Sequence, residues 1–105
     1  MHKQYHSDYY QAIIQLRPAE TELVRFVENQ ISKNKTVFIA KKINLKTGMD
    51  YYVSSNKFAR VLGKKMKKSF RGILKESRKL HTMDRHTSKK VYRVTVCFRL
   101  IPKEA

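Results

Sequence analysis

Apolar and polar side chains alternate at the start of the chain, and the spacing then becomes helical. Over residues 9–17 the alternation predicts a strand with one buried face, made by Tyr10, Ala12, Ile14 and Leu16. Pro18 suits the first turn of a helix, and acidic Glu20 and Glu22 suit its positive end. A four-residue repeat then predicts an amphipathic helix to about residue 33, with an inner stripe of Ala19, Leu23, Val27 and Ile31.

The middle of the chain predicts a hairpin followed by a second helix. Residues 37–45 and 49–54 are expected as strands, joined by a turn at residues 46–48 in which Gly48 is free to adopt a positive φ. One of the polar residues 54–56 caps the helix. The helix is expected to end near residue 70, with Gly72 as a stop signal. Its predicted inner stripe consists of Phe58, Val61, Leu62 and Met66.

The last third predicts a weak strand, a long polar loop and a strong strand. These segments are residues 73–81, 78–90 and 91–101, the last with five alternating apolar side chains before Pro102. The order strand, helix, strand, strand, helix, strand, strand predicts a two-layer α+β sandwich related to the ferredoxin-like fold. We expect a mainly antiparallel sheet with two helices on one face. Residues 8–102 would form this single domain, with a flexible leader at 1–7 and a tail at 103–105.

Positive charge is concentrated in one third of the chain. The whole sequence carries 24 basic and 8 acidic residues, a net charge of +16. Residues 56–90 hold thirteen basic and two acidic side chains, a net charge of +11. A field of this size favours polyanions, of which nucleic acid is the first candidate and an anionic membrane surface the second. A generically basic protein is the remaining alternative.

The thirteen basic residues of this third are the candidate RNA contacts. Like charges at helical spacing repel one another, and a phosphate backbone relieves that repulsion. An ordinary solvated helix face and an ordinary mobile loop are the competing interpretations. The helix contributes Lys57, Arg60, Lys64, Lys65, Lys67 and Lys68, and the segment after it contributes Arg71, Lys75, Arg78, Lys79, Arg85, Lys89 and Lys90.

The residue types of known catalytic and metal sites are sparse. Cys97 is the only cysteine, so the sequence has no cysteine-rich zinc site, and a reducing, cytoplasmic location is expected. His81 and His86 flank Asp84, but their spacing places them on no common face, so no enzyme, metal or cofactor is predicted. A nuclease using the two histidines is a weaker alternative. Tyr51 or Tyr52 could stack on a base, although core packing is the preferred interpretation.

Three segments resemble a known family in their order and spacing. They are residues 8–17, residues 48–55 with the Ala59–Arg60 pair after them, and residues 75–102. The chain is similar to the large-subunit export adaptors named for nonsense-mediated mRNA decay protein three, in their archaeal branch. The resemblance implies binding to ribosomal RNA and large-subunit proteins during late subunit maturation. The zinc segments with Cys-x-x-Cys motifs and the export extension of the family have no counterpart here, so no export activity is assigned.

The remaining partners are expected to be few. We predict no small-molecule substrate and no membrane partner, and a monomer is favoured. No apolar run approaches the ~18 residues of a membrane span. A module that uses the same basic helix to bind a membrane surface or a protein scaffold is the alternative function.

Overall fold

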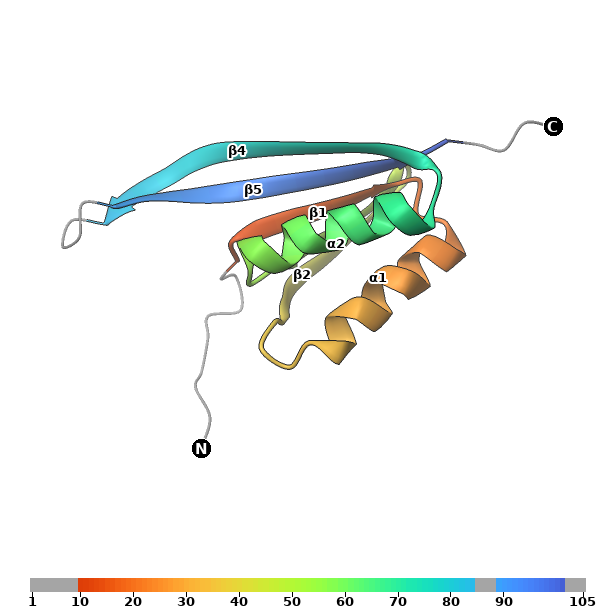
Figure 1. Ribbon diagram of the computed structural model, residues 1–105, viewed down its shortest axis with the longest axis horizontal. Coiled ribbons are helices and arrows are strands. Elements are labelled where there is room, and N and C mark those ends of the chain that lie inside the picture. Colours follow the sequence, from red (N-terminus) through yellow and green to blue (C-terminus); the bar gives the residue numbers. More distant parts are fainter. Residues whose placement is uncertain (1–9, 85–88, 102–105) are drawn as a thin grey trace.

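Five strands and two helices follow one another in the predicted order (Figure 1). The computed structural model describes residues 10–84 and 89–101, with the side chains of residues 81–91 excepted. The predicted leader, the tail and residues 85–88 therefore lie outside the described residues. The elements are β1 (Ala12–Arg17), α1 (Thr21–Lys33), β2 (Ile39–Leu45), β3 (Gly48–Val53), α2 (Asn56–Ser69), β4 (Gly72–Asp84) and β5 (Lys89–Leu100).

The strands form one mixed sheet in the order β2-β3-β1-β5-β4. The β1–β5 pair is parallel, and the other three pairs are antiparallel. This arrangement confirms the mainly antiparallel α+β sandwich and supplies the strand order, which the sequence could not. Its relation to the ferredoxin-like pattern is now visible. The additional strand β5 folds back on β4 and inserts itself between β4 and β1.

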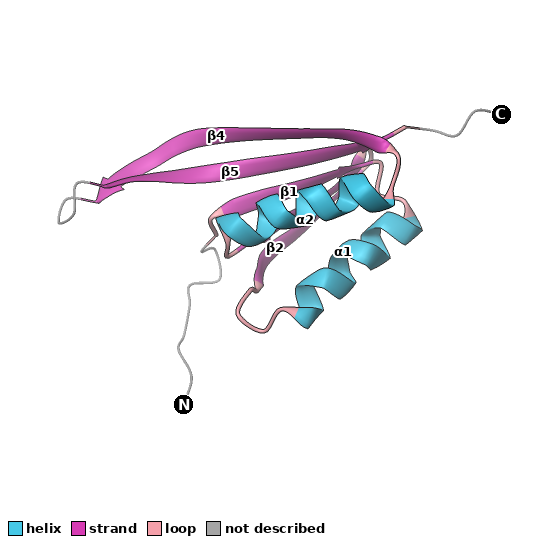
Figure 2. Cartoon of the chain, viewed as in Figure 1, coloured by secondary structure: helices cyan, strands magenta, loops and turns pink. Residues whose placement is uncertain are grey.

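The core lies between the helices and one face of the sheet, as Figure 2 shows from the same side as Figure 1. Ile14, Leu16 and Phe98 point from the central strands toward Leu23 of α1 and Leu62 of α2, and all five side chains are at most 1% exposed. Alternate residues of β1 are only half-buried. The opposite face of the sheet, called here the open face, is covered by no helix among the described residues.

The second helix turns a different stripe inward from the one predicted. Its buried residues are Ala59, Leu62, Gly63 and Met66. Val61 was predicted on the inner stripe and is 42% exposed, so that prediction is wrong. The reason is the close approach at Gly63, where an added Cβ would lie only 2.8 Å from Val96 Cγ1. Small residues let the helix backbone rest on the sheet, which rotates Val61 outward.

Two local predictions near β1 also fail. Pro18 lies before α1 rather than in its first turn, because the helix begins at Thr21 with Glu20 as its N-cap. Gly48 does not adopt a positive φ. It is the first residue of β3, and an added Cβ there would overlap the Leu16 carbonyl oxygen and lie 2.9 Å from Arg17 Cδ. Close packing of β3 on β1, rather than turn geometry, accounts for glycine at this position.

The basic segment predicted as a loop is largely a continuation of two strands. β4 pairs with β5 as far as Asp84 and Lys89, with a register shift between Leu80 and Thr82. Asn56, the first residue of α2, donates a side-chain hydrogen bond to the Tyr92 carbonyl at 3.1 Å. The strands continue past that point without a helix beside them, and Figure 1 shows them projecting as a two-stranded ribbon. Gly72, predicted to stop the helix, instead begins β4.

Candidate nucleic-acid interface

The start of α2 fixes where its lysines point. Ser55 is the N-cap, and its Oγ accepts a hydrogen bond from the Phe58 N–H at 3.1 Å. The cap satisfies one of the free N–H groups of the first turn, which stabilises the helix and sets its first residue. The apolar side chains then face the sheet, and the basic side chains are left for the other faces.

Three of the predicted contacts form a row along the outside of α2. Lys57, Lys64 and Lys68 are exposed and lie opposite the buried stripe. Lys64 and Lys68 are neighbours one turn apart, and Lys57 lies about two turns before Lys64. Lys68 also lies in the last turn, where a positive charge suits the helix dipole. These three residues are called the outer row. No hydrogen bond or ion pair to another described residue engages them, so all three charges are available to a partner.

Other basic residues of α2 point to the two sides. Arg60 points toward β4, where its Nε lies 3.7 Å from Glu76 Oε1. Lys65 points toward α1, and its Nζ donates a hydrogen bond to Gln30 Oε1 at 3.3 Å. Arg60 is therefore partly neutralised within the protein. Lys65 keeps its full charge, because its partner is a neutral amide.

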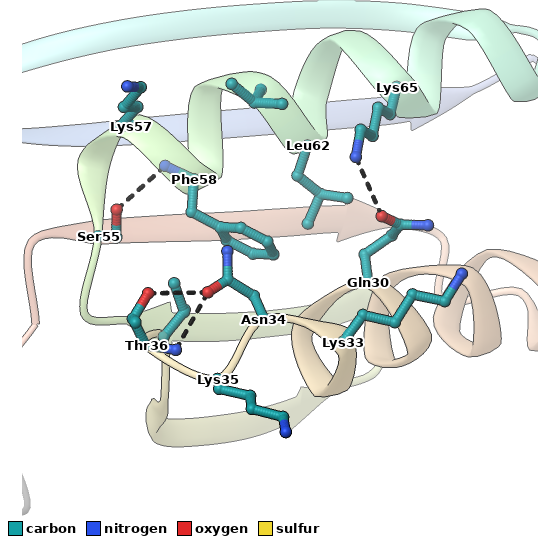
Figure 3. Close-up of a pocket in the computed structure, with 12 residues that line it drawn as sticks. Gln30, Lys33, Asn34, Lys35, Thr36, Ser55, Lys57, Phe58, Leu62 and Lys65 are labelled. Carbon is teal, nitrogen blue, oxygen red and sulfur yellow. Dashed lines mark hydrogen bonds between the residues drawn. The ribbon is translucent and has the colours of Figure 1, made fainter.

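A groove of about 610 Å³ separates the end of α1 from the start of α2 (Figure 3). Its apolar lining consists of Val37, Phe58, Val61 and Leu62, and four lysines line it as well. None of the lining residues is acidic. The groove therefore combines an apolar surface with a concentrated positive potential, which suits the phosphates and sugars of a nucleic acid. The four lysines are Lys33, Lys35, Lys57 and Lys65.

Two of these groove lysines were missed by the sequence analysis. Lys33 ends α1 and Lys35 follows it, so both reach the groove from a segment outside the basic third. Residues 1–35 carry five basic and four acidic side chains and look almost neutral when counted together. The signal was the local Lys33-Asn34-Lys35 sequence. The net charge counted over 35 residues did not show this local positive charge.

The predicted contacts on β4 divide between the two faces of the sheet. Arg78 lies on the helix side, opposite Val94, and its Cζ is 5.9 Å from the centroid of the Tyr92 ring. Lys75 and Lys79 lie on the open face, since they alternate with Arg78 along the strand. The thirteen predicted residues therefore do not form one surface.

The rest of the predicted set is placed only in part. Lys67 is exposed in the last turn of α2, and Arg71 is exposed in the connection to β4. Arg85 lies outside the described residues. Lys89 and Lys90 are described only as backbone in β5. The interface that the structure supports is therefore the outer row together with the groove.

A family profile described as the second domain of NMD3 matches residues 9–100. The chain belongs to the NMD3 family. No curated protein matches the chain. Membership confirms the resemblance carried by the three sequence segments, and it is consistent with ribosome biogenesis or association with the large ribosomal subunit.

Part of the sequence pattern that resembles the NMD3 family has a structural role here. Asp50 is 8% exposed, and its Oδ1 lies 2.8 Å from Arg17 Nη1. The two groups form an ion pair without a well-aligned hydrogen bond to that oxygen. Arg17 Nη1 also donates to the Leu16 carbonyl at 2.9 Å. Gly48 and Asp50 thus join β3 to β1, so their place in the pattern needs no contact with RNA.

A second polar contact holds α1 of this NMD3 domain on the sheet. Tyr51 is fully buried, and its hydroxyl donates to Glu28 Oε2 at 2.8 Å, while Lys42 Nζ lies 3.0 Å from the same oxygen. The hydrogen bonds from Lys42 and Tyr51 lower the pKa of Glu28. Burial, followed by the hydrogen bond to Glu28 and the charge of Glu28, raises the pKa of the Tyr51 hydroxyl. By fixing α1, this contact fixes the position of Lys33 at the groove.

Other kinds of site find no support in the described part of the NMD3 domain. No group of three or more histidine, cysteine or carboxylate side chains gathers among the described residues. The side chains of His81 and Asp84 and the whole of His86 lie outside that part, so the histidine pair remains untested. No described helix is long and apolar enough to cross a membrane.

Proposed function

We propose that this domain binds ribosomal RNA in the biogenesis of the large ribosomal subunit or in association with it. The outer row and the groove lysines contact phosphates, and the domain carries out no catalysis. Ribosomal RNA and large-subunit proteins are the expected partners. Placement of the chain in the archaeal branch, a cytoplasmic location and a monomeric state remain predictions.

One observation carries the proposal, namely a helix whose outward cations lack acidic neighbours. No acidic residue occurs between Asp50 and Glu76, a stretch that contains all of α2. Glu76 pairs with Arg60 at the side of the helix and leaves the outer row unneutralised. Lys64 and Lys68, which are four residues apart, repel each other by about a few tenths of a kcal/mol, and a phosphate bound between them attracts both and outweighs that repulsion.

The membrane-surface alternative is disfavoured by where α2 places its apolar side chains. A helix that lies in a membrane surface needs an apolar face for the lipid. In α2, Ala59, Leu62 and Met66 are committed to the core, and Val61 is the only large aliphatic side chain outside it. We expect co-sedimentation with anionic liposomes to be weak and to disappear at physiological salt. Retention that persists in high salt would favour the membrane alternative.

The experiment compares two variants with the same change in charge. Lys64→Gln/Lys68→Gln removes two charges of the outer row, and Arg25→Gln/Lys46→Gln removes two exposed charges from α1 and the β2–β3 turn. Affinity for purified large-subunit ribosomal RNA is measured against salt concentration. Each lost phosphate contact reduces the slope of log K against log salt by about 0.7 to 0.9. We therefore expect the outer-row variant to lose between about one and two units of slope and the control to lose almost none.

Two results would count against the proposal. Equal losses in the two variants would mean that only the net charge matters and would refute the assignment of the outer row. No binding of ribosomal RNA by the unsubstituted domain would refute the function itself. Intact RNA after prolonged incubation with the domain is expected, and cleavage that requires His81 and His86 would establish the nuclease alternative.

A further inference from the structure

A line of cations and aromatic rings crosses the open face of the sheet, on the side opposite α2. Lys79 of β4 pairs with Arg93 of β5, and Tyr52 of β3 pairs with Lys41 of β2. The Tyr10 ring lies between these pairs. It contacts Arg93 and Tyr52, so the line runs over the whole sheet. These five residues are called the open-face row.

Tyr10 reaches this row through a change of direction before β1. Alternation along residues 9–17 predicted Tyr10 on the buried face with Ala12, and the structure places it on the other face. β1 begins only at Ala12, and the backbone bends at Gln11. The Tyr10 and Tyr52 rings then meet edge to face, with centroids 4.8 Å apart and planes at 86°.

Each ring is accompanied by a cation. Arg93 Cζ lies over the Tyr10 ring, 4.0 Å from its centroid, and Lys41 Nζ lies 5.1 Å from the centroid of the Tyr52 ring. Among the described residues the Nε of Arg93 has no hydrogen-bond partner. Aromatic rings and the planar guanidinium are the surfaces on which unpaired bases stack. Tyr51, by contrast, is fully buried, so the structure selects Tyr52 from the two tyrosines considered.

Charge on the open face favours a polyanion over a protein of mixed charge. Lys41, Lys75, Lys79 and Arg99 are exposed there, and none of them has an ion pair with a described residue. Among the residues whose side chains are described, Asp50 is the only acidic one on this face of the strands, and its charge is balanced by Arg17. Five strands at their usual spacing make a row about 19 Å wide. A four-stranded sheet of comparable width accommodates two or three stacked bases.

We propose that the open-face row binds an unpaired RNA strand by base stacking, as a second surface distinct from the phosphate-binding face of α2. This inference rests on the proposed RNA-binding function and adds the kind of RNA that the far side of the domain accepts. The two surfaces lie on opposite sides of the sheet. One domain could then hold a paired segment on α2 and an unpaired segment on the sheet.

The test uses two probes. One is a 12-nucleotide oligouridine, and the other is an RNA hairpin whose unpaired nucleotides are confined to its loop. Tyr52→Leu removes a stacking ring and is expected to weaken oligouridine binding at least about fivefold, since each stacked base contributes on that scale. Hairpin affinity and its salt slope should not change. Tyr52→Phe keeps the ring and should keep the affinity. The matched control, Lys64→Gln/Lys68→Gln, should weaken hairpin binding and reduce its salt slope.

A second variant tests the same surface in case Tyr52→Leu does not fold. Lys41→Gln/Lys79→Gln changes only exposed side chains at the two ends of the row, and it should reduce the oligouridine salt slope by about 1.4. Unchanged oligouridine affinity in both open-face variants, or no oligouridine binding by the unsubstituted domain, overturns this inference. If ribosomal RNA still binds in that case, the proposed function stands. If neither RNA binds, both proposals fail.

Discussion

The contact between α2 and the sheet at Gly63 predicts that Gly63→Ala destabilises the domain, whereas helix propensity predicts the opposite. Glycine inside a helix destabilises it by roughly 0.5–1 kcal/mol relative to alanine. On helix propensity alone, Gly63→Ala would therefore stabilise the domain. In the structure, however, the added Cβ would lie 2.8 Å from Val96 Cγ1 and 3.1 Å from Leu74 Cδ1. Val96 is fully buried and cannot simply turn away.

The magnitude follows from these two opposing terms. A carbon–carbon distance of 2.8 Å lies well inside the ordinary contact range of about 3.5–4.0 Å, so α2 or β5 must move by several tenths of an ångström. Overpacking a tight core in this way costs about 1–3 kcal/mol. Taking the middle of each range, Gly63→Ala should destabilise the domain by about 1 kcal/mol after the gain in helix propensity. Lys64→Ala at the next, exposed position should stay within about 0.5 kcal/mol of the original.

Urea unfolding followed by circular dichroism measures this free energy, and a double-mutant cycle isolates its cause. Val96→Ala alone creates a cavity and is destabilising. In the double variant the methyl group introduced at position 63 occupies space that Val96 has vacated. The loss of stability in the double variant should therefore be smaller than the sum of the losses in the two single variants, by at least about 0.5 kcal/mol. Additive losses would refute the close-contact argument, and so would a Gly63→Ala variant that is more stable than the original.

Two further predictions concern stability. Tyr51→Phe removes the hydrogen bond to the charged Glu28 and should cost about 1–2 kcal/mol in urea unfolding at pH 7. Because the folded pKa of Glu28 is lowered below its ordinary 4.5, this stabilisation is present above pH 4.5 and is lost as the pH falls through the folded value, so the difference from the original domain should shrink at acid pH. A constant difference from pH 7 to pH 3 would contradict it. Ser55→Ala should cost about 1 kcal/mol by removing the cap on the Phe58 N–H, whereas Ser55→Asp should retain most of it; equal stability of the three would show that the cap is unimportant.

Much of the fold could be predicted because one face of most elements is buried. Where a strand or helix packs on the core, its apolar residues must follow the period of that element, as they do at Leu23, Val27 and Ile31 in α1 and at Val94, Val96 and Phe98 in β5. The order of elements, both helices and the resemblance to the NMD3 family all came from such segments, and the structure and the family match confirm them.

The predictions that failed concern segments without a buried face, which have no hydrophobic period, and positions where the backbone departs from the regular geometry of its element. Beyond Tyr92 the β4–β5 ribbon has no helix beside it, so its residues carry no apolar alternation and resemble a loop. Val61 and Tyr10 were misplaced because the close contact at Gly63 and the bend at Gln11 are not encoded in hydrophobic spacing. The basic helix was found by charge. Lys33 was missed because the charges of residues 1–35 were counted together. In the open-face row, Lys79 and Tyr52 were named from the sequence as candidate contacts, whereas Tyr10, Lys41 and Arg93 were not, because their neighbours in space are distant in sequence.

The parallel pairing of β1 with β5 bears on how the chain folds as it is synthesised. Ala12 pairs with Val94 and Arg17 with Arg99, so the second residue of each pair is made about eighty positions after the first. Until residue 99 or so is available, β1 has a neighbour only on its β3 side, and the buried face of α2 lacks Val96 and Phe98 beneath it. Closing so long a loop is slow relative to forming the β2–β3 hairpin. A nascent chain would therefore expose the middle of its sheet until nearly the whole domain has been translated, and the last strand would complete the fold in a single late step.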